Sequence, residues 1–101
     1  MMNKRTKTYT EKISKVVEKF PLITKAVVVG PATKDTFSFS ENIMLAIYTK
    51  PEAKISKTCI DLNRCLGDNG IFNVDIYMMA DEDFYMEVHN LIDEGEVIFT
   101  R

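Results

Sequence analysis

The chain has 101 residues, 46% of them hydrophobic and 28% charged, and we expect one globular domain with a single hydrophobic core. The formal net charge of −2 argues against general nucleic-acid binding, because such binding needs a basic face. No apolar stretch approaches the roughly 18 residues that span a bilayer, so we expect no membrane contact. Two cysteines and the lack of a signal-peptide pattern predict a reduced, cytoplasmic location.

The N-terminal segment is basic. Residues 1–8 show no apolar periodicity, and we expect them to form a flexible tail before a domain that spans residues 9–101. Thr8 and Glu11 have the spacing of a capping box, and apolar residues follow them at helical spacing. These features predict an amphipathic helix over residues 9–20.

Two strands follow this helix. Residues 23–29 include three consecutive valines, which is typical of a central strand that is buried on both faces. Residues 43–49 predict a second strand. The loop between them has no clear crossover helix, so we expect the two strands to be able to pair antiparallel.

The rest of the chain alternates between helical and strand patterns. Residues 49–52 signal the start of a second helix, and its apolar face carries Ile55, Cys59, Leu62 and Leu66. Residues 72–79 predict a third strand. Asp81 can cap a last helix, and residues 96–100 predict a short final strand. The order of elements indicates an α/β fold, a single mixed sheet of about four strands flanked by about three to four helices.

Gly30 and Pro31 follow the first predicted strand, Asn42 and Met44 lie at the start of the second, and Asp75 lies in the third. This layout resembles the minimal nucleotidyltransferases, small bacterial members of the DNA polymerase beta-like superfamily. In that family a strand leads to Gly-Ser and a short helix, the next strand carries Asp-x-Asp, and a later strand carries a third Asp. Here Gly30 stands at the Gly position and Pro31 replaces the Ser. Asn42 and Met44 replace the paired aspartates, and only Asp75 matches an acid.

The resemblance covers roughly residues 10–100 and implies a nucleotidyltransferase-like fold with a short helix after Gly30. Pro31 suits such a helix, because proline is favoured at the first helical position. The family signature has few residues, so a generic small α/β domain with a coincidental Gly-Pro turn remains an alternative.

The chemistry of the family requires a divalent metal that bridges the phosphates, and Mg²⁺ prefers anionic oxygen ligands. Asn42 offers a neutral carbonyl oxygen, and Met44 offers a thioether, which is a soft and weak ligand. We therefore expect no catalytic residue and no bound metal, with Asp75 as a weak metal candidate or a vestigial acid. Asp35 or Glu41 could add a second acid, although both are more simply interpreted as solvated surface residues.

The family's phosphate-binding turn is also altered. In the family the Ser hydroxyl and nearby backbone N–H groups contact phosphate at a helix N-terminus. Pro31 has neither a hydroxyl nor an N–H group. Lys34 could contact phosphate as a point charge, or it could be a solvated loop lysine.

Other reactive side chains have simpler interpretations. His89 is the only histidine and has no motif partner, so we expect it on the surface. Cys59 and Cys65 do not have the spacing of a zinc pair or a redox motif, and Cys59 is expected to face the core. Met78 and Met79 are expected to pack in the core or to form a binding surface.

Three functions remain open. Minimal nucleotidyltransferases are commonly paired with a HEPN-domain protein as antitoxin and toxin, so the resemblance implies an antitoxin-like, non-catalytic binding partner of a small helical HEPN-type protein. The first alternative is an active enzyme that uses ATP and Mg²⁺ with unusual ligands, including Asn42 and Asp75. The second alternative is a nucleotide or small-ligand sensor without turnover. We expect no cofactor unless the enzyme is active.

Overall fold

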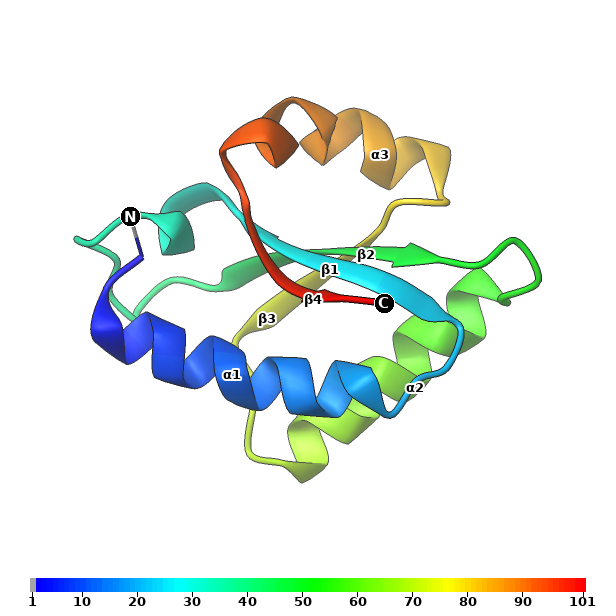
Figure 1. The fold of residues 1–101 in the computed structure, drawn as a ribbon, viewed down its shortest axis with the longest axis horizontal. Helices are drawn as coiled ribbons and strands as arrows, with labels where there is room; N and C mark the ends of the chain where they lie inside the picture. The colour runs from blue at the N-terminus through cyan, green and yellow to red at the C-terminus, as the bar shows by residue number, and fades with distance from the viewer. Residues whose placement is uncertain (1) are drawn as a thin grey trace.

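The structure is a computed structural model that describes residues 2–101. It contains four strands, three α-helices and two short 3₁₀ helices (Figure 1). In chain order they are α1 (Lys4–Glu18), β1 (Ile23–Val29), η1 (Gly30–Thr33), β2 (Ile43–Thr49), α2 (Ile55–Asp68), β3 (Val74–Met78), α3 (Glu82–Val88), η2 (His89–Glu94) and β4 (Glu96–Thr100). In this part of the chain, no helix is both long and apolar enough to cross a membrane.

The strands form one mixed sheet in the order β3-β2-β1-β4. β1 is antiparallel to both β2 and β4, whereas β2 and β3 are parallel. Helices α1 and α2 cover one face of the sheet, and α3 and η2 cover the other face (Figure 1). The predicted α/β class, with a single mixed sheet of four strands, is confirmed.

The valines of β1 explain why the sheet is covered on both faces. Val28 belongs to the core between the sheet and α1 and α2, whereas Val27 and Val29 belong to the core beneath α3 and η2. All three side chains are buried, as predicted for a central strand. Met78 and Met79 are buried too, and they extend these two cores in opposite directions.

Helix α1 begins at Lys4, five residues earlier than expected. Its cap is Asn3, whose side-chain oxygen accepts a hydrogen bond from the Thr6 N–H group at 2.8 Å. The Asn3 amide group also donates to the backbone carbonyls of Asp35 at 3.1 Å and Phe37 at 3.3 Å. One side chain therefore starts the helix and ties it to the loop after η1.

The prediction of a tail over residues 1–8 is therefore wrong for residues 4–8, which form the first turns of α1; residue 1 lies outside the described residues. The apparent capping box misled the sequence interpretation, because Thr8 lies inside the helix and its hydroxyl donates to the Lys4 carbonyl at 3.2 Å. The apolar periodicity of the first turns was also hidden, since Thr6 and Thr10 occupy buried positions there.

Two other helix boundaries differ from the expected ones. α2 begins at Ile55, because residues 50–53 form a turn closed by a hydrogen bond from the Ala53 N–H group to the Lys50 carbonyl at 3.1 Å. The last helix becomes a 3₁₀ helix, η2, after Val88. The short helix that the family resemblance implied after Gly30 corresponds to η1.

Replacing Asn3 with alanine removes the cap of α1 and both hydrogen bonds to the loop. We expect Asn3→Ala to lower the free energy of unfolding by about 1–2 kcal/mol, which urea unfolding followed by circular dichroism measures. Asn90→Ala is the matched control, because Asn90 is exposed in η2. Equal urea midpoints for the two variants would contradict this role of Asn3.

Candidate functional site

The structure brings together the positions that the family resemblance singled out. Met44 of β2 pairs with Val29 of β1 on one side and with Asp75 of β3 on the other. Asn42 lies just before β2, and its amide donates a hydrogen bond to the Asp75 carboxylate at 3.1 Å. Gly30 follows Val29 directly. These positions therefore meet where β1 ends and where β2 and β3 begin, and we call them the strand-end cluster: Gly30, Asn42, Met44 and Asp75.

The sulfur of Met44 occupies the space beside the Gly30 turn. Gly30 has a φ of 73°, a conformation that L side chains rarely adopt. A Cβ atom at Gly30 would lie only 2.8 Å from the Met44 sulfur. The turn therefore needs glycine both for its backbone conformation and for the close approach of the thioether.

The donor set of the strand-end cluster does not fit a magnesium ion. It offers one exposed carboxylate from Asp75, the side chain of Asn42 that is bonded to it, and the thioether of Met44. Among residues 2–101, no group of three or more His, Cys, Asp and Glu side chains could hold a metal ion. Neither Asp35 nor Glu41 therefore completes such a group, and both side chains are exposed.

The turn after β1 offers few free hydrogen-bond donors that could bind a phosphate group. Pro31 is exposed in the first turn of η1 and has no N–H group to donate. The hydroxyl of the buried residue Thr33 donates to the Gly30 carbonyl at 2.7 Å, so it is used within the turn. Lys34 is exposed directly after η1, and its backbone N–H group donates to the Pro31 carbonyl at 3.1 Å. Sequence reasoning missed Thr33, because its role depends on the 3₁₀ geometry.

Tyr77 connects the strand-end cluster to helix α3, and sequence reasoning also missed it. Its ring meets that of Phe84 edge to face, with 5.8 Å between the ring centroids. The pKa of Tyr77 is raised, mainly by burial and further by the negative charges of Asp75 and Glu87. The face of the sheet that carries the cluster therefore continues under α3.

The remaining reactive side chains do not form a catalytic group. His89 is exposed, and its ring stacks on that of Tyr85 with 5.2 Å between the ring centroids. Cys59 and Cys65 are both free and half-buried. Burial raises the pKa of the Cys59 thiol, which makes it a poorer nucleophile.

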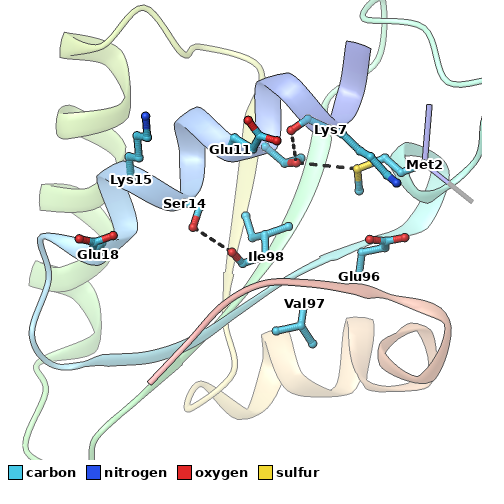
Figure 2. A pocket seen from close by; sticks show the side chains of 10 residues that line it. Met2, Lys7, Glu11, Ser14, Lys15, Glu18, Glu96, Val97 and Ile98 are labelled. Carbon is cyan, nitrogen blue, oxygen red and sulfur yellow. Dashed lines mark hydrogen bonds between the residues drawn. The ribbon is translucent and has the colours of Figure 1, made fainter. Parts of the chain in front are cut away.

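Four cavities of about 300–540 Å³ lie elsewhere, and the strand-end cluster lines none of these four. The cavity of about 540 Å³ separates α1 from the edge strand β4 (Figure 2). In its wall the Ser14 hydroxyl donates to the Ile98 carbonyl at 2.8 Å. Ile98 is skipped in the pairing of β4 with β1, at an irregularity in the register.

Comparison of the chain with models of known protein families gives no match, and comparison with curated proteins gives none. Function must therefore be inferred from the geometry and chemistry of the residues themselves.

The contact between Met44 and Gly30 can be measured with a matched pair of glycine variants. Gly30 and Gly70 both have positive φ angles, of 73° and 77°, but a Cβ at Gly70 would meet nothing within 4 Å. Each substitution by alanine should cost about 1–2 kcal/mol of backbone strain. We expect Gly30→Ala to lose more stability than Gly70→Ala in urea unfolding, because of the additional clash with the sulfur.

We expect Gly30→Ala to cost less stability when residue 44 is already alanine. The difference between Gly30→Ala/Met44→Ala and Met44→Ala should therefore be smaller than the difference between Gly30→Ala and the natural chain. A double-mutant cycle in urea unfolding gives this coupling directly. If the two substitutions are additive, the sulfur does not fill the space beside the turn.

Proposed function

We propose that this chain is a catalytically degenerate nucleotidyltransferase-like protein that acts by binding another protein, and that its partner is a small helical protein of the HEPN type. The observation that carries the proposal is the strand-end cluster. The positions of the family's metal ligands meet in space, but Asn42 hydrogen-bonds to the single acid, Asp75, and Met44 covers the turn at Gly30. Nucleotidyl transfer depends on metal held by several carboxylates, and this donor set cannot provide them.

Exposed apolar side chains on α3 support a role in binding a protein. Phe84, Tyr85 and Met86 are 36%, 45% and 62% exposed. These consecutive residues point in different directions around the helix, so they spread apolar surface over its exposed side. Exposed apolar side chains surrounded by charged residues are typical of protein interfaces. We name this surface the α3 patch: Phe84, Tyr85 and Met86.

The charge around the α3 patch defines the partner further. Residues 74–100, from β3 to β4, contain no Lys or Arg and eight acids: Asp75, Asp81, Glu82, Asp83, Glu87, Asp93, Glu94 and Glu96. A protein that docks on the α3 patch must therefore complement a strongly acidic surface. We infer that the partner presents basic side chains around an apolar groove or stripe.

Restoring the missing carboxylates tests the degenerate site. In the variant Asn42→Asp/Met44→Asp, three acids crowd the strand-end cluster, so we expect a lower melting temperature without metal and recovery with millimolar Mg²⁺. The natural chain should show no Mg²⁺-dependent change in melting temperature. Met86→Asp/Asn90→Asp is the control, because it adds the same charge at exposed positions.

The same samples separate the alternatives. We expect no transfer of labelled AMP from ATP by the natural chain. Mg²⁺-dependent labelling that Asp75→Ala abolishes would overturn the proposal in favour of an active enzyme. Saturable binding of Mg²⁺-ATP to the strand-end cluster without turnover would favour a sensor, and calorimetric titration detects it.

A charge placed in the α3 patch tests the binding role. We expect the chain to form a stable complex with a small helical protein encoded beside it, and Met86→Lys to weaken this complex at least tenfold, or about 1.4 kcal/mol. Ile60→Lys is the matched control, because Ile60 is 57% exposed on α2, which covers the other face of the sheet. Calorimetry or gel filtration of the co-expressed pair measures the difference. Recovery of the chain from its native cell as a monomer without any partner would contradict the proposal.

A further inference from the structure

The net charge of −2 conceals two halves of opposite charge. Residues 1–64 carry twelve Lys and Arg against six Asp and Glu, a net charge of +6. Residues 65–101 carry one cation, Arg101, and nine acids, a net charge of −8. α1 carries much of the basic charge, with five Lys and Arg against two Glu, whereas α2 spans the boundary between the halves and is neutral, with Lys57 and Arg64 against Asp61 and Asp68. α3 and η2 belong to the acidic half and lie on the opposite face of the sheet from α1 (Figure 1).

The basic half contains two neighbouring cavities along α1. These cavities, of about 450 and 300 Å³, share Lys12. The larger is lined by Arg5, Thr8, Tyr9, Lys12, Phe39 and Asn73, and the smaller by Lys12, Lys15, Val16, Lys19 and Asn69. None of these lining residues is acidic. We call the two cavities together the α1 groove.

Three of the four cations of the α1 groove form a line, and the fourth, Lys15, also lines the cavity beside β4. Arg5, Lys12 and Lys19 are spaced seven residues apart, which places them on the same side of the helix. At 1.5 Å per residue, Arg5 and Lys19 are separated by about 21 Å along the helix axis. The acids of α1, Glu11 and Glu18, lie instead in the wall of the cavity beside β4 (Figure 2).

These cations are available to a ligand. Within residues 2–101 the ion pair that the structure contains joins Lys57 and Asp61 of α2, so no carboxylate neutralises the α1 groove. Arg5, Lys12 and Lys19 are all exposed. A row of unpaired cations about two helix turns apart matches an anion that extends in one direction better than it matches a single phosphate group.

One end of the α1 groove is aromatic. The rings of Tyr9 and Phe39 meet edge to face, with 5.1 Å between centroids, and the Arg5 guanidinium lies 4.9 Å from the centre of the Phe39 ring. The Tyr9 hydroxyl donates to the side-chain oxygen of Asn73 at 2.5 Å, which leaves the Asn73 amide N–H groups to donate to a ligand. Aromatic and guanidinium planes of this kind stack on nucleic-acid bases.

We propose that the α1 groove binds a short single-stranded segment of nucleic acid. Its phosphates lie along Arg5, Lys12 and Lys19, and one base stacks at the end formed by Tyr9 and Phe39. The expectation against general nucleic-acid binding came from the net charge, which averages over two opposite surfaces. This proposal is independent of the proposed function, since the α1 groove and the α3 patch lie on opposite faces of the sheet.

Fluorescence anisotropy with labelled oligouridylate and oligothymidylate of about 12 nucleotides tests the proposal. We expect both to bind, with log K falling against log salt at a slope of about −2, because three cations release about 0.7 counterion each. Binding of only one of the two also supports the proposal and identifies the sugar that the groove selects. Failure of both to bind at low salt would overturn it.

Charge reversal at the centre of the groove provides the sharper test. We expect Lys12→Glu to weaken binding at least tenfold and Lys7→Glu to weaken it less than threefold. Lys7→Glu is the matched control, because it makes the same change in charge on the same helix but lies in the wall of the cavity beside β4. Equal losses would overturn the proposal, since they would mean that only long-range charge acts.

The aromatic end is tested without a change in charge. We expect Phe39→Leu to weaken binding while the salt slope stays the same, with circular dichroism confirming that the variant is folded. Unchanged affinity in folded Phe39→Leu, or displacement of the oligonucleotide by equal concentrations of polyglutamate, would overturn the proposal in favour of a general polyanion surface. Binding of the protein partner to Lys12→Glu should be unaffected, so the two proposals can fail separately.

Discussion

The enclosure of the C-terminal part of β1 is the constraint on which the rest of this protein depends. The strand pairs on both edges, and its residues 26–29 are buried on both faces of the sheet. Val28 requires α1 and α2 on one face, and Val27 and Val29 require α3 and η2 on the other. Because β1 cannot shift without exposing one of these sets, Gly30 leaves the sheet at a fixed place beside β2. The strand-end cluster follows from that enclosure.

The strands and the start of α3 could be predicted from the sequence, whereas the starts of α1 and α2 could not. Asp81 caps α3 as expected, because its side chain accepts hydrogen bonds from the N–H groups of Asp83 and Phe84. The apolar runs between turn residues predicted the observed bounds of β1, β2 and β4, because strands that are buried in the core consist mainly of apolar residues. The start of α1 depends on Asn3, whose amide is held by backbone carbonyls more than thirty residues away. A contact with residues so far away in the sequence cannot be predicted from the residues next to Asn3. Thr8 and Glu11 offered a local signal of the same kind, and the tertiary contact of Asn3 determined the boundary instead.

The positions of the candidate site could be predicted from the sequence, whereas the contacts between their side chains are seen only in the structure. The resemblance to the minimal nucleotidyltransferases identified Gly30, Asn42, Met44 and Asp75, and the strand register brings these positions together. The resemblance could not reveal that Asn42 donates to Asp75, or that the Met44 sulfur lies against the turn, since both depend on side-chain rotamers. The α1 groove escaped prediction for a different reason. The net charge is a sum over the whole chain, so it does not indicate on which surface of the protein the positive and negative side chains lie.

The contact between Ser14 and Ile98 has a consequence for the exposed edge of the sheet. β4 is an edge strand, and an unpaired edge is a template on which further strands can grow into fibrils. The irregular pairing at Ile98 interrupts the ladder, and the Ser14 hydroxyl occupies the carbonyl that it releases. The negative charge of Glu96 at the start of the strand adds repulsion between copies. α1, which packs on the core, thus also occupies a carbonyl group of β4 with which a further strand could otherwise pair.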